Sequence, residues 1–506
     1  MGTLKHKWII SIAVMLGTMM EIIDASIVNV ALPDMMGNLG ATLDEITWMV
    51  TGYILANVII IPLSGWLGAR FGRKRYFLFS LALFTGASFF CGFIQNLHFL
   101  IFARILQGIG GGALIPTSQA ILMETFPLEE QGTATSIFGL GMMVGPTLGP
   151  TLGGWIVDNY SWPWIFYINI PFGIVDFLLV LFFIEDPPYL KPTSSRVDYV
   201  GFILLAVGLG CLQTVLEKGE RENWFESNFI AWLSLLAALA LPLFIWWELK
   251  TDHPVINLRV LANRFFCIGT IFSTIIGFGL YGSNVLISVY FQNLLGYSSW
   301  DAGKVVFYAA STIALMMPLS GKLVNKVSPR YMVGVGVLFF ALAIYRMSHF
   351  TLETGHAEVF WTQVIRGLGL GLSFVPLNVI SLRTLDKKDI PAASGIYNLM
   401  RQLGGSFGIA ILVTVLTRRE AVHRANLIQY VSLLNPLTVQ RLNTLEQGLL
   451  ARGEDFVSAK IGALKLLDHT VNTQAMMLSF IDAFWLIVFL TLLSLPLLLL
   501  FKKNGP

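Results

Sequence analysis

Charged residues inside apolar segments are the first candidates for chemistry in this sequence. Glu21 and Asp24 stand three residues apart in an apolar run, so on a helix they share one face. Arg104 lies in another apolar run without an acidic neighbour, so its partner must come from another helix or from water. A carboxylate that alternates between an apolar environment and a nearby arginine can take up a proton on one side of a barrier and release it on the other. The alternatives are interhelical hydrogen bonds for the carboxylates and a structural tether to backbone carbonyls for the arginine.

The composition of the chain excludes a soluble protein. Hydrophobic residues make up 55% of the 506 residues and charged residues only 12%, whereas an average soluble domain has roughly 25% charged residues. So apolar a chain is expected to lie in a lipid bilayer. The net charge of +3 provides no polybasic surface for nucleic acid. Cys91, Cys211 and Cys267 fall in apolar stretches, which argues against a disulfide framework and against a metal site.

Fourteen apolar segments are long enough to cross a bilayer as helices. We expect them near residues 8–32, 48–69, 76–95, 99–122, 132–157, 163–184, 199–217, 229–248, 267–291, 301–321, 331–349, 358–382, 391–417 and 476–500. Lysines and arginines gather in the loops on the side of the N-terminus, whereas the short loops on the other side hold only Lys218 and Arg221. Because positive charge marks the cytoplasmic side, both termini are expected in the cytoplasm.

The chain contains an internal duplication. Gln107–Gly110 corresponds to Arg366–Gly369, and Ala134–Phe138 corresponds to Ala393–Tyr397, each with an offset of 259 residues. Two copies of a six-helix unit are therefore expected, with two helices inserted between them. The predicted divisions are an N-terminal half at 1–190, the inserted helices at 191–255, and a C-terminal half at 256–506 that includes an outside insert at 418–475.

Several motifs resemble those of one transporter family. Gly65–Arg75 is similar to the signature between helices two and three of the major facilitator superfamily, and Arg104–Gly110 resembles its helix-four motif. Gly141–Gly154 resembles the helix-five motif of its antiporters, and Asp24–Pro33 resembles the helix-one motif of its fourteen-helix drug:proton antiporters. The resemblance implies an all-α membrane protein with the major facilitator fold, in which two six-helix halves rock about a site near the midplane.

These motifs, together with the two carboxylates of the first span, single out three groups of residues. The expected roles are proton coupling or substrate contact, a gating loop, and an antiporter helix whose glycines allow close packing and whose prolines introduce kinks. The groups are, in that order, Asp24, Glu21, Arg104, Asn29 and Gln107; Gly65, Arg70, Gly72 and Arg73; and Gly145, Pro146, Gly149 and Gly153. Ala69 departs from the family, whose loop usually carries an aspartate at this position, so the usual charge relay there is absent or rebuilt.

Three further charges lie within or near predicted spans of the second half. Arg366 and Arg401 lie within spans, and Asp482 lies a turn or two into the last span, near its outer mouth. Each is a candidate for lining the transport cavity. The alternatives are pairing between helices and extension of the charged head to the membrane interface.

The outside insert at 418–475 is polar and carries spaced apolar residues that predict short amphipathic helices. It is either a solvated cap or a surface for a partner. Asp158–Pro171 and Arg419–His423 resemble the EmrB subgroup of the family. That resemblance implies a periplasmic, EmrA-like membrane-fusion adaptor and an outer-membrane channel as partners, and the insert is the candidate docking site.

The resemblance thus implies a transporter of the bacterial inner membrane that exports hydrophobic or cationic amphiphilic drugs in exchange for protons. The sequence contains no phosphate-binding loop for ATP, and no cofactor is expected. Gly404–Gly408 matches a nucleophile-elbow pattern only in its letters, because it lies within a span, so an enzyme is disfavoured. Export of an endogenous lipid, siderophore or peptide, and a scaffold or sensor that transports nothing, remain open alternatives.

Overall fold

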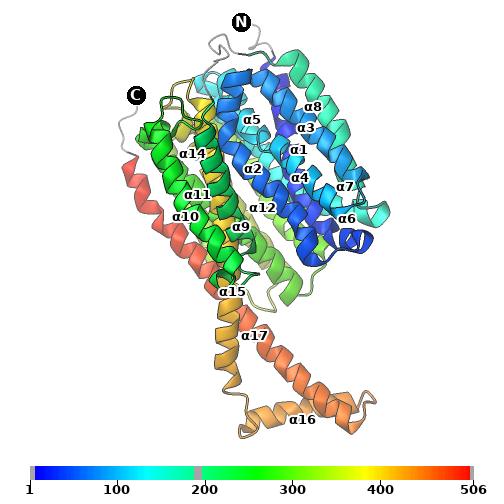
Figure 1. Ribbon diagram of the computed structural model, residues 1–506. Coiled ribbons are helices and arrows are strands. Elements are labelled where there is room, and N and C mark those ends of the chain that lie inside the picture. Colours follow the sequence, from blue (N-terminus) through cyan, green and yellow to red (C-terminus); the bar gives the residue numbers. More distant parts are fainter. Residues whose placement is uncertain (1–5, 187–196, 502–506) are drawn as a thin grey trace.

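Residues 6–186 and 197–501 are described by a computed structural model (Figure 1), and their regular secondary structure is helical throughout. The first six predicted spans correspond to α1 (Lys7–Leu39), α2 (Leu43–Phe71), α3 (Arg73–Phe93), α4 with α5 (Leu97–Gly111, Leu114–Thr125), α6 (Gln131–Asn159) and α7 with α8 (Trp164–Tyr167, Asn169–Phe183). The later helices are α9 (Tyr199–Lys218), α10 (Asn228–Lys250), α11 (Arg264–Val289), α12 (Ser299–Leu323), α13 (Pro329–Met347), α14 (His356–Leu382), α15 (Ile390–Ile428), α16 (Pro436–Leu450) and α17 (Phe456–Leu493).

The number of spans is close to the predicted fourteen. Within the described residues, thirteen helical segments are long and apolar enough to cross a membrane. The remaining predicted span, at 132–157, corresponds to helix α6. It has 29 residues, and at about 1.5 Å per residue it is longer than the roughly 30 Å hydrocarbon core. It carries no charged side chain before Asp158.

The predicted span at 99–122 is interrupted. Helix α4 ends at Gly111 and α5 begins at Leu114, after a run of glycines. Glycine is a weak helix former, but bulkier residues do not fit here. A Cβ atom on Gly112 would lie 2.7 Å from the backbone oxygen of Asn57 on α2. The close approach of α2 therefore requires the glycine that weakens the helix.

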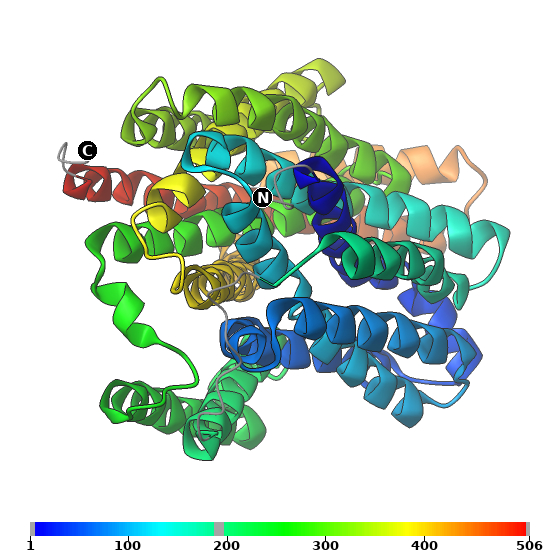
Figure 2. The ribbon, with the colours of Figure 1, turned by 90° about the horizontal axis from the view of Figure 1, so that it is seen from above.

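The helices form two groups in contact with each other (Figures 1 and 2). In the first group α1 packs on α6 and α8, and α3 packs on α4 and α8; in the second, α11 packs on α15, and α13 packs on α14 and α17. The groups meet where α6 contacts α12 and where α2 contacts α15. Helices α9 and α10 pair with each other, and α9 contacts both α2 and α15.

The two ends of the bundle differ (Figure 1). The start of α1 and the end of the described chain lie at the same end of the bundle, here called the terminal end. At the opposite end α15 and α17 continue beyond the bundle and are joined by α16, forming a triangular projection, here called the extension. The sequence predicts short amphipathic helices in 418–475, and α16 is one, whereas the flanks of the insert belong to the long helices α15 and α17. Helix breakers are absent from 418–428 and few in 456–475, so both membrane helices continue outward.

The glycine stripe of α6 packs directly on α1. A Cβ atom on Gly145 would lie 2.2 Å from Cγ2 of Ile22 and 2.9 Å from its backbone carbon. Ser26 donates a hydrogen bond to the backbone oxygen of Gly145 at 3.0 Å. Pro146 lies in α6, but its side chain is outside the part that the structure describes. The stripe thus allows the two backbones to approach each other closely, as its spacing predicts.

Replacing Gly145 by valine is expected to destabilise the packing of α1 on α6. Overpacking of this kind costs about 1–3 kcal/mol, because the backbone of Ile22 cannot move aside as a flexible side chain would. The measurement is thermal unfolding of the purified protein in detergent. Gly154→Val is the matched control on the same helix, since its Cβ would meet only Val30, at 3.9 Å. Equal melting temperatures for the two variants would contradict the expectation.

Candidate functional site

A network of buried polar side chains joins α1, α4 and α8 in the first half of the chain. Asp24 has no exposed surface and Arg104 is 1% exposed. Nη1 of Arg104 donates to Oδ2 of Asp24 at 2.6 Å. The side-chain amides of Gln107 and Asn169 each donate to Oδ1 of Asp24 at 2.8 Å. The carboxylate thus accepts hydrogen bonds from three donors, an arrangement that stabilises an ionised carboxylate among apolar helices.

Arg104 is held by aromatic rings as well as by the carboxylate. Its guanidinium carbon lies 4.2 Å from the centre of the Tyr53 ring and 5.6 Å from that of Phe166. Gln107, one turn further along α4, accepts from Nη1 of Arg104 at 2.7 Å and donates to Ser88 on α3 at 2.6 Å. Of the two partners that the sequence leaves open for Arg104, another helix or water, the structure shows another helix.

Glu21 is buried on the same helix but contacts a separate set of residues. Its Oε1 accepts from the amide of Asn57 on α2 at 2.7 Å, and its Oε2 is buried without a hydrogen-bond partner. Asn57 accepts in turn from the amide of Gln402 on α15 at 3.4 Å. These bonds link the carboxylate of the first half to a helix of the second half.

Asn29 is not brought into this network. It is exposed, and the hydrogen bonds to Asp24 come from other residues. Five residues of helix correspond to a rotation of roughly 140° beyond one full turn, so Asn29 and Asp24 lie on different faces of α1. Gln107, by contrast, belongs to this network, and its role in coupling or substrate contact stays a prediction.

The loop between α2 and α3 is anchored at the terminal end of the first half. Gly72 has a φ angle of +89°, which favours glycine, and a Cβ atom there would lie 2.9 Å from a carboxylate oxygen of Asp186. Arg73, directly after it, forms an ion pair with Glu124 at the end of α5. The loop thus connects α3 with α5 and with the chain that follows α8.

Two other residues of the predicted gating loop belong to α2 itself. The guanidinium of Arg70 lies 5.5 Å from a ring centre of Trp66. Gly65 faces α15, where a Cβ atom would lie 2.8 Å from Cα of Ala392. Gly65 is therefore a point of contact between the two halves. Ala69 lies at an exposed position close to Arg70.

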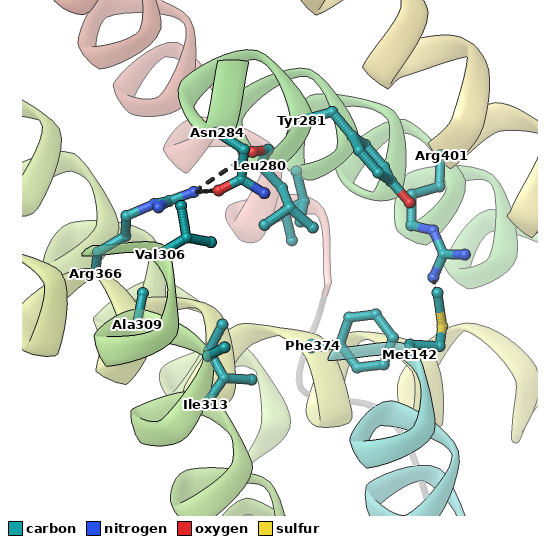
Figure 3. Close-up of a pocket in the computed structure, with 12 residues that line it drawn as sticks. Met142, Leu280, Tyr281, Asn284, Val306, Ala309, Ile313, Arg366, Phe374 and Arg401 are labelled. Atoms are coloured by element: carbon teal, nitrogen blue, oxygen red, sulfur yellow. Dashed lines mark hydrogen bonds between the residues drawn. The ribbon is translucent and has the colours of Figure 1, made fainter. Parts of the chain in front are cut away.

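A cavity in the second half is lined by α11, α12, α14 and α15, with one wall from α6 (Figure 3). Most of its lining is apolar, and two arginines, Arg366 and Arg401, reach it from different helices. Nη1 of Arg401 lies 3.1 Å from the sulfur of Met142, and its guanidinium lies 5.9 Å from the ring centre of Phe374. Both arginines predicted as cavity charges therefore lie at a cavity.

Asp482 is placed elsewhere. It lies where α15 and α17 leave the bundle, 30% exposed, and its Oδ2 accepts from Nε of Arg419 at 2.5 Å and from Nε2 of His423 at 2.8 Å. The carboxylate thus joins the bases of the two extension helices, and it is absent from the lining of the described cavity. The basic residues of Arg419–His423 are its partners.

Sequence reasoning missed Asn169, Asn57 and Ser88. Each is a neutral polar residue in an apolar span, which is a weaker signal than a charge because such residues also hydrogen-bond to their own helix. Asn169 falls within the segment that resembles the EmrB subgroup, so it could have been found there. Within the described residues, no group of three or more histidine, cysteine, aspartate or glutamate residues is arranged to hold a metal ion.

The comparisons with known proteins agree with this architecture. The model of the Major Facilitator Superfamily matches residues 14–409. The chain is 34% identical to the multidrug export protein EmrB of Escherichia coli K12, over 96% of this chain and 94% of that protein. It is 33% identical to the fatty acid resistance protein FarB of Neisseria gonorrhoeae, over 97% and 96%.

A solved structure shows the same fold. The crystal structure of the human organic anion transporter MFSD10 aligns with a TM-score of 0.60 over 96% of this chain and 99% of that one, at 14% sequence identity. This similarity concerns the fold alone. Together with the family match and the identity to export proteins over nearly the full length, it leads to one conclusion: the chain belongs to the major facilitator superfamily and, within it, to the EmrB-like multidrug export proteins.

Proposed function

We propose that this chain exports hydrophobic or cationic amphiphilic compounds across the bacterial inner membrane in exchange for protons. Family membership and the similarity to multidrug export proteins support export. The single observation that supports coupling to protons is the buried pair of Asp24 and Arg104. A buried carboxylate that can exchange an arginine partner for a proton changes its charge without leaving the membrane interior.

The coupling step follows from the bonds of Asp24. When ionised it holds Arg104, Gln107 and Asn169 together, and thereby α4 and α8 against α1. Protonation removes the charge that pairs with Arg104, so these helices lose their strongest common contact. We propose that this change favours the rearrangement that moves the opening of the bundle from one side of the membrane to the other. Release of the proton then restores the network.

The rocking units proposed are residues 1–190 and 256–506, with the inserted helices at 191–255 between them. Contacts between residues exactly one repeat apart support this division. Gln119 donates to Asn378 at 2.6 Å and Arg401 donates to Met142 at 3.1 Å, and both pairs are separated by 259 residues. Equivalent residues of two repeats can touch only near the axis that relates the repeats. The axis therefore runs between α5 and α14 and between α6 and α15.

The orientation proposed places the terminal end in the cytoplasm and the extension outside. The enrichment of lysine and arginine in the loops of the terminal end supports it. The expected direction of transport is from the terminal end to the extension end.

Transport into inverted membrane vesicles tests the function. Vesicles that contain the protein should accumulate a fluorescent cationic dye when respiration acidifies their interior, and a protonophore should abolish the accumulation. Vesicles that lack the protein provide the baseline. Dye accumulation that is equal with and without the proton gradient would exclude proton coupling. A loss of flux for every dye tested would favour a narrow endogenous substrate.

We also propose that the extension docks a periplasmic membrane-fusion adaptor that leads to an outer-membrane channel. Apolar side chains at the tip support this proposal. Leu433, Leu434 and Leu437 are 75%, 94% and 73% exposed just before and at the start of α16. Such a cluster outside the membrane is typical of a protein contact.

Replacing these three leucines by serine is expected to abolish co-purification of the adaptor with the transporter, because the contact loses its apolar surface. Dye uptake by inverted vesicles is expected to remain within about twofold of the unchanged protein, since surface changes rarely affect a distant fold. The matched control replaces Phe456 and Val457, two exposed apolar residues at the start of α17. Adaptor binding that survives the triple change but not the control would assign the contact to α17.

A further inference from the structure

The polar network of the first half has a counterpart in the second half that lacks a carboxylate. On α14, Gln363 stands 259 residues after Arg104, and Arg366 stands 259 residues after Gln107. The arginine and the glutamine have therefore changed places between the two repeats. Nη1 of Arg366 donates to Gln363 at 3.2 Å, and its Nη2 donates at 3.0 Å to Ser283 on α11. Ser283 stands 259 residues after Asp24. The position that supplies the negative charge in the first half thus carries a neutral hydroxyl here.

Among the described residues, neither arginine of the second-half cavity has a negatively charged partner, although both are buried. Arg366 is 1% and Arg401 is 5% exposed. The acceptors around Arg366 are neutral groups of Gln363, Ser283, Asn284 and the backbone. Among the described hydrogen bonds, Arg401 has only the one to the sulfur of Met142 on α6. Nε of each arginine is buried without a hydrogen-bond partner. Buried cations of this kind are strongly unfavourable unless an anion approaches them.

A buried carboxylate of the first half, Glu21 on α1, does not pair with Arg401 among the described residues. No ion pair within 4.0 Å joins them among those described, and Oε1 of Glu21 is already bonded to Asn57. Among the described ion pairs, Glu21 therefore leaves Arg401 without a carboxylate partner, and Nε of Arg401 remains without a hydrogen bond.

We propose that this cavity binds the acidic headgroup of an amphiphilic substrate. The two guanidinium groups provide the positive charge and the free donors that a carboxylate requires. The apolar walls, which include Leu280, Ile313 and Phe374, are suited to the adjoining part of an alkyl or aryl tail (Figure 3). In this conformation the free space in the cavity is small, about 30 Å³, so it accommodates a headgroup and not a whole drug molecule.

The direction of transport is consistent with an anionic substrate. A bacterial membrane is negative inside, so the potential favours the movement of an anion outward. This inference rests on the proposed export function and adds acidic amphiphiles to its substrates. It assigns the headgroup to the second half and leaves proton binding to the carboxylates of the first half.

Three amphiphiles with the same twelve-carbon tail test the inference: dodecanoate, dodecanol and dodecyltrimethylammonium. Equilibrium binding of each radiolabelled compound to the full chain in lipid nanodiscs is measured against empty nanodiscs. We expect dodecanoate to bind more tightly than dodecanol. Arg401→Gln should weaken dodecanoate binding by about 10- to 100-fold, as expected for loss of a hydrogen bond to a charged group. Arg401→Lys should retain much of the affinity, and dodecyltrimethylammonium should bind equally to all variants.

Arg346→Gln is the matched control, because this arginine of α13 does not line the cavity. Equal affinity for dodecanoate and dodecanol would overturn the inference, as would an equal loss of all three ligands in Arg401→Gln. Vesicle transport separates this result from the proposed function. Gradient-driven dye export without dodecanoate binding would refute only the headgroup site. Dodecanoate binding at Arg401 without gradient-driven flux of any compound would refute the export function.

Discussion

Replacing Asp24 by asparagine is expected to lower gradient-driven dye export at least about tenfold, to the level measured with a protonophore. The change removes the negative charge that Arg104 contacts at 2.6 Å and leaves a buried guanidinium without a charged partner. Breaking a buried ion pair in this way costs about 3–5 kcal/mol. It also removes the carboxylate of the described network, to which we assign proton binding. The measurement is dye uptake by inverted vesicles, with and without protonophore.

Two further variants separate loss of coupling from loss of folding. Asp34→Asn is the matched control, because Asp34 lies on the same helix at an exposed position near its end; its uptake should equal that of the unchanged protein. The double variant Asp24→Asn, Arg104→Gln removes both charges and should recover thermal stability without recovering uptake. Protonophore-sensitive uptake at the normal rate in Asp24→Asn would contradict the assignment, and Glu21→Gln would then be the next variant to test.

The charged residues of the site could be identified from the sequence because a charge in an apolar span is costly. This principle found Asp24, Arg104, Arg366 and Arg401, which all lie in buried networks or at the cavity. The motif of α4 likewise found Gln107. The fold followed from the number of apolar segments and from the duplication, and both the family and the architecture are confirmed.

The environment of each charge was less predictable, because it depends on where helices end. The sequence places Asp482 near the outer mouth of the last span and makes it a candidate for lining the cavity. Helix α15 continues past its span instead and brings Arg419 and His423 beside Asp482. Neutral amides such as Asn169 gave no distinct signal, because the free energy of placing them in a membrane helix is modest compared with that of a charge.

The contact between α6 and α12 supports the second prediction, because it differs along its length. Near the terminal end, a Cβ atom on Gly132 would lie 2.3 Å from the backbone oxygen of Gly321, and Ser136 donates to the backbone of Met317 at 2.8 Å. Near the extension end, a Cβ atom on Gly303 would meet nothing closer than a side-chain oxygen at 3.8 Å. The two halves are therefore closed against each other at the terminal end.

Replacing Gly132 by leucine is expected to prevent this closure, because the backbone of α12 cannot yield to the new side chain. Overpacking that costs about 1–3 kcal/mol shifts the equilibrium between the closed and open terminal end by about 5- to 150-fold. Dye uptake should fall at least about tenfold. In a chain without its native cysteines, a cysteine at Ser136 should react faster with a membrane-impermeant maleimide added to inverted vesicles.

Gly303→Leu is the matched control on the facing helix of the same contact, and it should leave both uptake and labelling within about twofold of the unchanged protein, since its Cβ meets no backbone. Faster labelling with normal uptake in Gly132→Leu would mean that closure of the terminal end at this contact is not required for transport. Equal loss of uptake in both glycine variants would mean that the whole length of the α6–α12 contact must close during the cycle. Rocking about the axis between α6 and α15 brings first one end of this contact together and then the other.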